Sequence, residues 1–518
     1  MESSVSRESN CHREGGCDCL PATDLDPCAI VIFGASGDLA ARKLIPALYH
    51  MYLTSSLPDP VSIVGCARTE FSADAFRLRM KEACQDHGQA DMSRWPEFAA
   101  LLFYQQLTYD SRESFQGLAS CLRDLDLQRG LLGNLVFYLA LPPSLYPVVA
   151  TMIGGAGLAA GSRDGRGWSR IVVEKPFGSD LESSGELDRT LRTHFQEEQI
   201  FRIDHYLAKE TVQNILMFRF ANTIFEPLWK REYVDYVGIM AAEKLGVENR
   251  AGYYEQAGVI RDMFQNHMLQ LLSLVAMEPP SVFESERVRD EKVKVFRAIR
   301  PFHRQEAEVV LGQYGPGVID GREVPGYLQE PGVAAGSLIP TFALMRFAVE
   351  NWRWQGVPFY LVSGKRLSAK ETRVVIQFKD VPHSLFRDVL GERIVANRLI
   401  LGIYPEEGIS LTFQTKNPGA RICLRSMTMD FRYDTTSVLD AYEKVLLDCI
   451  LGDHMLFWRQ DAVEEAWRVL TPVLNECEMC RGREQKLIIY PAGSWGPETA
   501  RPWIDKIRIK THVPPAGR

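Results

Sequence analysis

The feature that most constrains this fold is a short apolar run followed at once by glycines and a helical pattern. Residues 28–33 read CAIVIF, which has the length and β-branching of a buried strand. Beyond Gly34 and Gly37, apolar residues recur at helical spacing as far as residue 53. Further strand patterns alternate with helical ones at residues 61–68, 135–141 and 170–177. This alternation predicts an α/β domain with a parallel, doubly wound sheet.

The second half of the chain has a different pattern, in which apolar and polar residues alternate along strands that are separated by turns. These strands are predicted at residues 235–243, 372–380, 398–405, 408–415 and 427–433. Alternation of this kind is typical of an antiparallel sheet. Long helical patterns at 258–277 and 441–453 flank the strands. The second domain is therefore predicted to be α+β, with a mostly antiparallel sheet.

Length and charge restrict the function. A chain of 518 residues exceeds the usual size of one hydrophobic core, so we expect two domains. The net charge of −7 argues against nonspecific binding to nucleic acid or to an anionic membrane. The longest uncharged run, 135–162, is interrupted by prolines and glycines and does not resemble a membrane span. No signal peptide is recognisable at the start of the chain, so we expect a cytoplasmic protein.

The 11 cysteines are scattered and do not form a disulfide framework. Four lie near the start of the chain, and Cys477 and Cys480 form a single C-x-x-C pair. Neither group has a second pair at zinc-finger spacing, so we interpret these cysteines as free thiols and predict no metal site.

A nucleotide site is predicted where the first strand meets the first helix. Gly34, Gly37 and Ala40 form G-x-x-G-x-x-A, in which glycines let backbone N–H groups approach a pyrophosphate at a helix N-terminus. A tight structural turn would leave the same pattern. After the second strand, the position that carries an acid in NAD-specific proteins holds Arg68, which suits a 2′-phosphate. NADP is therefore the expected cofactor, with NAD as a weaker alternative. The other interpretation of Arg68 is a solvated residue at a strand end.

Seven motifs in the same order connect this chain to a known family. They read GASGDLAARK, FYLALPPSLY, VVEKPFG, RIDHYLAKE, AGYYEQAGVIRDMFQNH, WQGVPFYLVSGKRL and YPAGSWGP. Together they resemble glucose-6-phosphate dehydrogenase of the bacterial type, over about residues 29 to 510. Residues 1–27 are rich in Ser, Cys, Gly and charged residues without periodicity, so we expect a flexible tail there. The resemblance implies a Rossmann NADP-binding domain at 28–204 and an α+β substrate-binding and dimerisation domain at 205–518. It also implies oxidation of glucose 6-phosphate at C1 and a homodimer or homotetramer.

The resemblance assigns the catalytic pair. A single histidine on an apolar helix, such as His267, is ordinarily a core residue, but the matching histidine in the family is the catalytic base. Asp204 of RIDHYLAKE matches the carboxylate that orients it. An aspartate that accepts from one ring nitrogen leaves the other free as the base and stabilises the imidazolium formed in the reaction.

Substrate and cofactor residues follow from the same motifs. If HYLAKE begins a helix, His205 and Lys209 stand on one face and form a phosphate cradle with Tyr206. The resemblance implies that the substrate is contacted by Lys175, His205, Tyr206, Lys209, Glu243, Asp262 and Lys365. It implies that the cofactor is contacted by Gly34, Ala35, Ser36, Gly37, Asp38, Leu39, Arg68, Tyr146 and Lys175. A cis peptide bond before Pro176 is expected as well.

The chain departs from the family pattern at several positions. Ala208 replaces a glycine in the phosphate-binding segment, and Tyr404 replaces a glutamine that contacts the sugar. Trp495 and Gly402 occupy two positions where animal enzymes bind a second, structural NADP, which places the chain with the bacterial type. Two alternatives remain: a related sugar oxidoreductase with another substrate, and a nonenzymatic regulator derived from a dehydrogenase.

Overall fold

The computed structural model describes residues 25–508. Its gaps are at residues 87–90, 161–166, 303–308, 384, 387–393, 420–422, 433–439 and 480–486. The cysteines of the N-terminal tail before Cys28, and the C-x-x-C pair at 477 and 480, therefore lie outside the described side chains. Within the described residues, no helix is long and apolar enough to cross a membrane.

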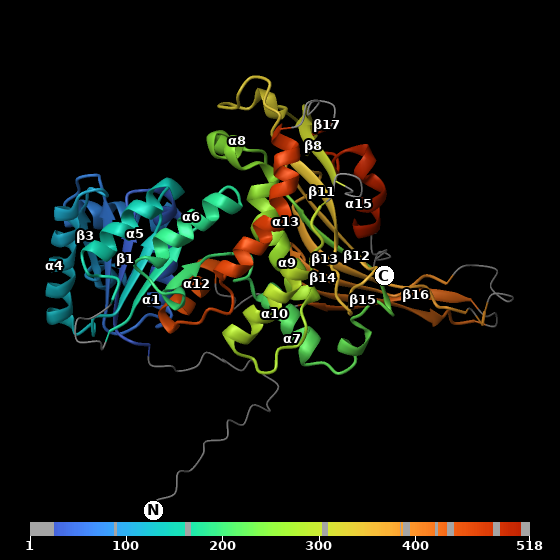
Figure 1. Cartoon of the computed structure of the whole chain (residues 1–518), viewed down its shortest axis with the longest axis horizontal. Helices are drawn as coiled ribbons and strands as arrows, with labels where there is room; N and C mark the ends of the chain where they lie inside the picture. Colours follow the sequence, from blue (N-terminus) through green and yellow to red (C-terminus); the bar gives the residue numbers. More distant parts are fainter. Residues whose placement is uncertain are drawn as a thin grey trace, which may run out of the picture.

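The first domain is the predicted parallel sheet, with strand order β3-β2-β1-β4-β5-β6 (Figure 1). Its strands are β1 (Cys28–Phe33), β2 (Val61–Ala67), β3 (Leu102–Gln106), β4 (Leu135–Leu139), β5 (Ser169–Val173) and β6 (Ile200–Arg202). Every residue of β1 is buried, which explains why it reads as a continuous apolar run. The helices are α1 (Ile45–Leu53), preceded by a π-helical turn at Ala40–Leu44, α2 (Ala73–Asp86), α3 (Trp95–Ala99), α4 (Arg112–Arg129), α5 (Tyr146–Gly155) and α6 (Leu181–Arg192).

The second domain contains a nine-stranded sheet in the order β16-β15-β14-β13-β7-β12-β11-β8-β17. The strands are β7 (Val234–Ala242), β8 (Val309–Gly315), β11 (Phe342–Ala348), β12 (Pro358–Gly364), β13 (Glu371–Phe378), β14 (Arg398–Tyr404), β15 (Gly408–Lys416), β16 (Leu424–Arg432) and β17 (Leu487–Pro491). A small hairpin joins β9 (Gly317–Ile319) to β10 (Arg322–Val324). Neighbouring strands are antiparallel except for β7 with β12 and β8 with β17. The predicted α+β class with a mostly antiparallel sheet is confirmed.

Helices cover one face of the larger sheet and continue toward the first domain (Figure 1). They are α7 (Glu210–Phe220), α8 (Ala251–Val259), α9 (Leu269–Ala276), α10 (Ser285–Ala298), α12 (Ala441–Leu451) and α13 (Gln460–Met479), with α15 (Arg501–Arg508) near the end of the described chain. The helical pattern at 258–277 is interrupted at its start. Gly258 has φ +57°, and Ile260–Met268 is π-helical before α9 begins. Asp262 and His267 both lie in this π-helical segment.

The two domains share a core. Helix α12, which comes late in the sequence, packs Val445, Leu446 and Cys449 into the same hydrophobic cluster as β1 and α1 of the first domain. At the other end of the chain, Asp26 accepts a hydrogen bond from Trp168 Nε1 at 3.1 Å, and Pro27 O accepts one from Asn134. These two residues, assigned above to the tail, are thus held against the first domain.

Candidate active site

Two side chains that are distant in the sequence meet in the core between the domains. His267 Nδ1 lies 2.6 Å from Asp204 Oδ1, and both side chains are almost fully buried. Asp204 follows the short strand β6, and His267 lies in the last turn of the π-helical segment that leads into α9. The same carboxylate oxygen also accepts the backbone N–H of Tyr206 at 2.9 Å. An ionised carboxylate accepts, so Nδ1 carries the proton and Nε2 is left as the basic nitrogen.

Lys175 occupies the other side of the histidine ring. Its Nζ lies 2.9 Å from His267 Nε2 and donates to Asp262 O at 3.0 Å and to Asp262 Oδ1 at 3.2 Å. Lys175 directly follows Glu174 at the end of β5, and its bond to Pro176 is cis, as expected from the sequence. An ammonium group of the first domain therefore lies against an imidazole of the second domain.

The surroundings of this pair keep the imidazole neutral and the carboxylate charged. Burial lowers the pKa of His267, Asp204 opposes that shift, and the Lys175 charge adds to it, so the pKa stays below its usual value. Burial would raise the pKa of Asp204, but the contact with His267, together with the hydrogen bond from the backbone N–H of Tyr206, outweighs it and leaves the pKa below its usual range. A neutral imidazole beside an ionised carboxylate is the resting state that a general base requires.

The segment after Asp204 corrects one prediction. Residues 205–208 form a turn, and α7 begins only at Glu210 with Lys209 as its extended N-cap, so the proposed helical face of His205 and Lys209 is wrong. The turn closes where Asp204 O accepts the backbone N–H of Leu207 at 3.0 Å. This geometry stacks the ring of Tyr206 on His267, with centroids 4.1 Å apart, and sets the ring of His205 edge-on at 4.6 Å.

A chain of alternating charges extends from Lys175 into the second domain. Lys365 Nζ lies 2.5 Å from Glu243 Oε2 and 3.9 Å from Asp262 Oδ2. Burial would raise the pKa of Asp262, but Lys175, Lys365 and Arg250 outweigh it and lower that pKa. Glu243 and Lys365 follow β7 and β12, which are parallel neighbours, so their ends meet at one edge of the sheet. The lowered pKa keeps Asp262 ionised, and the carboxylates of Asp262 and Glu243 are acceptors suited to hydroxyl donors.

Positive charge gathers at the outer end of this cluster. Lys209 Nζ lies 4.5 Å from the centroid of the Tyr206 ring and 6.0 Å from that of Tyr404, and Lys370 lies 4.1 Å from the Tyr404 ring. Burial lowers the pKa of Lys209, and the Lys370 charge lowers it further. Sequence reasoning missed Lys370, because its five-residue distance from Lys365 does not show that it faces Lys209. The ring of Tyr404, noted above as a departure, lies near both ammonium groups. Ala208 is buried in the core.

The predicted nucleotide turn lies at the end of β1. Gly34 has φ +83°, and a Cβ there would lie 2.2 Å from Ala140 O, so only glycine fits. Gly34 and Ala35 both donate their N–H groups to Cys66 O of β2, and Gly37 N donates to Gly34 O at 2.9 Å. Leu39 and Asp38 begin the helix that runs on into α1, and Asp38 forms an ion pair with Arg42 at 2.6 Å. A tight turn at a helix start therefore fits a pyrophosphate.

Arg68 is exposed directly after β2, and the neighbouring Thr69 donates to Ser36 Oγ at 3.2 Å. Sequence reasoning did not identify Arg79 of α2, which donates to Ser36 O at 3.0 Å and adds a second guanidinium to this edge. The cluster of Ser36, Arg68 and Arg79 fits a 2′-phosphate. Tyr146, assigned to the cofactor from its motif, is 1% exposed and belongs to the core of the first domain.

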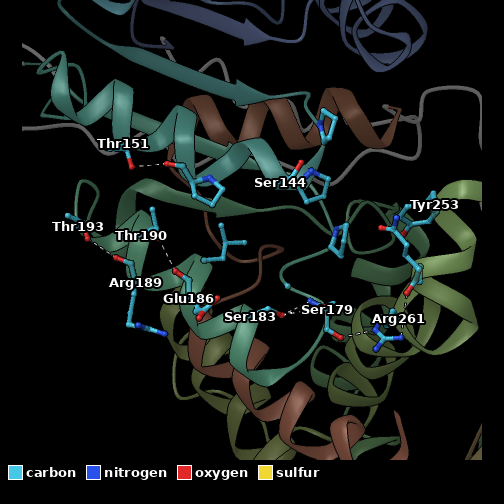
Figure 2. Close-up of a pocket in the computed structure, with 18 of the residues that line it drawn as sticks. Ser144, Thr151, Ser179, Ser183, Glu186, Arg189, Thr190, Thr193, Tyr253 and Arg261 are labelled. Atoms are coloured by element: carbon cyan, nitrogen blue, oxygen red, sulfur yellow. Dashed lines mark hydrogen bonds between the residues drawn. The ribbon is translucent and has the colours of Figure 1, made fainter. Parts of the chain in front are cut away.

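A groove of about 1230 Å³ runs beside this site between the two domains. It includes Pro176 and Tyr253 next to Lys175 but none of the residues of the histidine–aspartate pair. Figure 2 shows Glu186 and Thr190 of α6 on one side and Tyr253 and Arg261 of the second domain on the other. Arg261 Nε donates to Ser179 O at 2.7 Å and links the two domains. Within the described residues, no group of three or more histidine, cysteine, aspartate or glutamate residues could hold a metal ion.

Comparison with known proteins places this geometry in a family. Residues 31–214 match the model of the NAD binding domain of glucose-6-phosphate dehydrogenase, and residues 216–511 match its C-terminal domain. Glucose-6-phosphate 1-dehydrogenase of Aggregatibacter actinomycetemcomitans is 45% identical over 484 residues, which cover 92% of this chain and 96% of the relative. The Treponema pallidum enzyme of the same name is 45% identical over 499 residues, which cover 94% of this chain and 95% of the relative.

Solved structures agree with this result. A glucose-6-phosphate dehydrogenase in complex with its substrate glucose-6-phosphate superimposes with a TM-score of 0.85 at 36% identity, covering 94% of this chain and 98% of that one. The enzyme of Mycobacterium avium superimposes with a TM-score of 0.80 at 33% identity, covering 92% and 96%. Both family domains are matched in order and the relatives exceed 40% identity over nearly the whole chain, so this chain belongs to the glucose-6-phosphate dehydrogenase family.

Proposed function

We propose that this protein oxidises glucose 6-phosphate at C1 to 6-phosphoglucono-1,5-lactone with NADP as the hydride acceptor, the first step of the oxidative pentose phosphate pathway. The observation that carries the proposal is the buried contact of 2.6 Å between His267 Nδ1 and Asp204 Oδ1, with Lys175 at the opposite ring nitrogen. When hydride leaves C1, the C1 hydroxyl loses its proton, and a neutral, oriented base of this kind must accept that proton.

His267 Nε2 accepts the proton of the C1 hydroxyl, and Asp204 stabilises the imidazolium that results. Lys175 Nζ lies 2.9 Å from Nε2 and so marks the position that the hydroxyl takes. NADP, held by the Gly34–Leu39 turn and Arg68, would supply the hydride acceptor. Asp262 and Glu243, both beside Lys365, accept hydrogen bonds from sugar hydroxyls and fix the orientation of the ring.

The phosphate binds at the cationic end of the cluster. Lys209 and Lys370 flank Tyr404 there, and Tyr206 and His205 lie between this end and His267. Two ammonium groups and a phenol supply the donors that a phosphate dianion requires. This arrangement distinguishes a phosphorylated sugar from a free one.

The two domains have different roles in this reaction. Residues 28–204 bind NADP through the Gly34–Leu39 turn and Arg68, and residues 205–518 bind the sugar phosphate and provide the contact to a second copy of the chain. The absence of a membrane-crossing helix in the described residues and the bacterial relatives support a cytoplasmic location.

Initial rates test this proposal directly. We expect rapid NADPH formation with glucose 6-phosphate, a much slower rate with glucose at the same concentration, and a slower rate when NAD replaces NADP. Galactose 6-phosphate serves as the control for the sugar, because it keeps the phosphate and changes one hydroxyl. Equal rates with glucose and glucose 6-phosphate would contradict the assignment of the phosphate end.

A further inference from the structure

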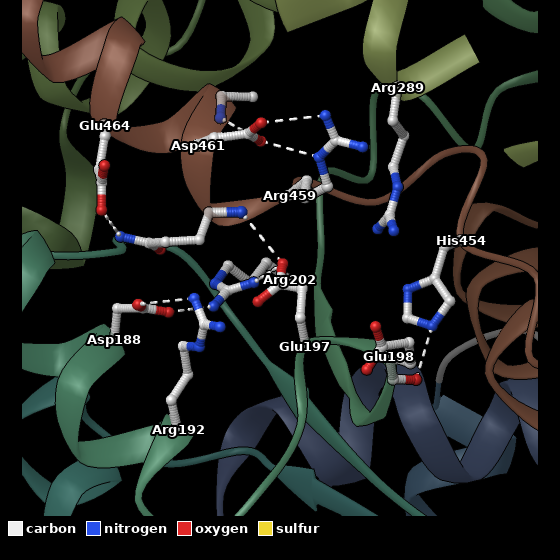
Figure 3. A network of polar contacts seen from close by, with 12 residues as sticks. Asp188, Arg192, Glu197, Glu198, Arg202, Arg289, His454, Arg459, Asp461 and Glu464 are labelled. Carbon is white, nitrogen blue, oxygen red and sulfur yellow. Dashed lines mark hydrogen bonds and ion pairs between the residues drawn. The ribbon is translucent and has the colours of Figure 1, made fainter. Parts of the chain in front are cut away.

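Some buried ion pairs of this protein join its structural elements at a distance from the sugar-binding groups. Figure 3 shows such a network, in which Arg202 pairs with Asp188 and Glu197, and Arg459 pairs with Asp461. A backbone N–H at the start of α13 donates to Glu197 Oε1 at 3.1 Å, so the network joins elements of both domains.

Arg366 belongs to a different kind of ion pair, because it directly follows Lys365, a residue assigned to the substrate. Its side chain is 11% exposed, and its Nη2 lies 2.9 Å from Glu330 Oε1 and 3.3 Å from Glu248 Oε1. The side chain of Glu330 is 5% exposed and also accepts a hydrogen bond from Tyr314 at 3.1 Å. The pair with Glu330 is therefore shielded from water, where charge-assisted hydrogen bonds are strong and well oriented.

The backbone of Arg366 has a conformation that side chains other than glycine and asparagine adopt infrequently. Its φ of +50° lies in the left-handed region. Its N–H donates to Leu245 O at 3.1 Å, and its carbonyl accepts the N–H of Gly493 at 2.8 Å. The next residue, Leu367, donates its N–H to Glu243 O at 2.9 Å. The chain thus keeps an unfavourable backbone conformation at the position from which a guanidinium reaches two carboxylates.

The segment that joins β7 to α8, residues 243–250, is the β7–α8 connector. It begins at Glu243, whose Oε2 lies 2.5 Å from Lys365 Nζ. The backbone bonds described above hold the start of the connector, and the guanidinium of Arg366 holds it further along, at Glu248. Arg366 therefore contacts the connector at two separate points, and both lie close in sequence to a sugar-binding group.

Gly246 shows how closely the connector lies against the ion pair. A Cβ added there would lie 2.6 Å from Arg366 Nε and 2.6 Å from Glu330 Oε1. Because glycine has no side chain, the backbone of the connector and the ion pair are in direct contact. Loss of the guanidinium therefore leaves unfilled space beside the backbone that follows Glu243, and the connector becomes free to move.

We propose that Arg366 is a positioning residue for substrate binding: its two ion pairs fix the β7–α8 connector, and thereby the orientation of Glu243 and Lys365 toward the sugar. The proposal rests on the proposed function, in which these two residues contact glucose 6-phosphate. A displaced contact weakens the binding of substrate and transition state alike, so the KM for glucose 6-phosphate rises while kcat changes little.

Three single variants test this role. Arg366→Gly removes the guanidinium and suits the left-handed backbone, so its effect is due to the lost ion pairs and not to strain. In this variant we expect the KM for glucose 6-phosphate to rise about tenfold, with kcat and the KM for NADP within about twofold. Arg366→Lys keeps the charge but lacks the planar guanidinium, so its KM should be intermediate. Gly246→Ala displaces the pair from the other side and should raise the same KM with Arg366 present.

A double variant separates positioning from folding. Arg366→Gly leaves Glu330 buried without its counter-charge, which should lower the melting temperature. Glu330→Gln in the same chain removes that charge, so the melting temperature should recover while the KM for glucose 6-phosphate stays high. A residue that only stabilises the fold would show recovery of both.

Two controls match the two features of Arg366. Arg459→Met removes an arginine from the network of Figure 3 and should lower the melting temperature without changing the KM for glucose 6-phosphate. Ser55→Gly replaces an exposed residue of the first domain that also has a left-handed backbone, with φ +55°, and should leave the KM unchanged as well.

Calorimetric titration with glucose 6-phosphate in the absence of NADP is a second measurement, which does not require turnover. We expect the Kd to weaken about tenfold in Arg366→Gly. An unchanged Kd and KM in this variant, or a KM that recovers together with the melting temperature in the double variant, would overturn the positioning role alone. An unaltered protein that neither binds nor oxidises glucose 6-phosphate would overturn the proposed function as well, so the two failures are distinguishable.

Discussion

The imidazole of His267 has a polar partner on each side of its ring, and the two partners have opposite effects. Asp204 at Nδ1 raises the pKa of the ring, whereas burial and Lys175 at Nε2 lower it, and the lowering effects prevail. The histidine is therefore neutral at neutral pH and can accept a proton. The same burial that holds the pair rigid also prevents water from replacing either contact.

Replacement of this residue gives the first prediction at the residue scale. We expect His267→Asn to lower kcat by about 10²–10⁴-fold while the KM for glucose 6-phosphate changes little, because the base is lost and the phosphate contacts remain. In the unaltered protein, activity should persist to a pH below the ordinary pKa of histidine, since a lowered pKa delays protonation. Steady-state kinetics against pH measures both effects. His383→Asn, an exposed histidine in the segment after β13, is the control and should behave as the unaltered protein.

Arg68 gives the second prediction at this scale. Its exposed guanidinium lies beside the Ser36 turn, where a 2′-phosphate would bind, so Arg68→Ala should raise the KM for NADP much more than that for NAD. The control is Arg123→Ala, an exposed arginine in the second half of α4. Initial rates with the two cofactors are the measurement. Equal increases in the KM for NADP and in the KM for NAD would show that Arg68 does not bind the 2′-phosphate.

At the scale of elements, the turn after β1 has backbone requirements that its side chains do not reveal. Gly34 adopts φ +83°, and its missing side chain leaves room for Ala140 O of the neighbouring strand end. Gly34→Ala should therefore destabilise the protein by about 1–3 kcal/mol through an unfavourable backbone conformation, with additional crowding, and should weaken NADP binding.

Gly117 provides a matched control for that substitution. It lies exposed in the interior of α4, where an added Cβ would meet nothing within 4 Å. Gly117→Ala should therefore stabilise the protein by about 0.5–1 kcal/mol, because alanine favours the helix. Denaturant unfolding of both variants, together with NADP titration, measures the difference. A Gly34→Ala protein as stable as the Gly117→Ala protein would refute the backbone argument.

Two segments with helical sequence patterns have a different local structure in the folded chain. The pattern at 258–277 was correctly predicted as helical, but its π-helical start, which carries Asp262 and His267, leaves no trace in apolar periodicity. The i, i+4 spacing of His205 and Lys209 would place them on one face if residues 205–210 began a helix, but residues 205–208 form a turn. The requirement that Asp204 and Tyr206 both face His267 overrides that local pattern.

At the scale of the whole molecule, one edge of the larger sheet remains apolar and uncovered. Met427, Met429 and Phe431 of β16 alternate onto one face and are 38%, 62% and 60% exposed. Their cross-strand neighbours in β15 are Phe413, Leu411 and Ile409. A strip of this kind on an edge strand favours association with a second copy of the chain, in agreement with the expected homodimer or homotetramer.

Disruption of this strip gives the prediction at the molecular scale. Met429→Asp should shift the protein toward a smaller assembly at equal concentration, because a charge would be buried at the interface. Sedimentation velocity is the measurement. Leu127→Asp, which alters an 86% exposed residue of α4 in the first domain, is the control. An unchanged sedimentation coefficient in the Met429 variant would place the interface elsewhere.

The sequence by itself determined the parallel first sheet, the antiparallel second sheet, the glycine turn and the family, because strand and helix periodicities are local and seven motifs in order are specific. It did not determine which charges meet. The contact of His267 with Asp204 spans 63 residues, and that of His267 with Lys175 spans 92. The approach of Lys370 to Tyr404 and the packing of α12 on the first sheet were likewise decided only by the tertiary structure. The physical reason is that a pKa or an ion pair depends on the distance between groups in space and on the exclusion of water. The spacing of residues along the chain determines neither of these.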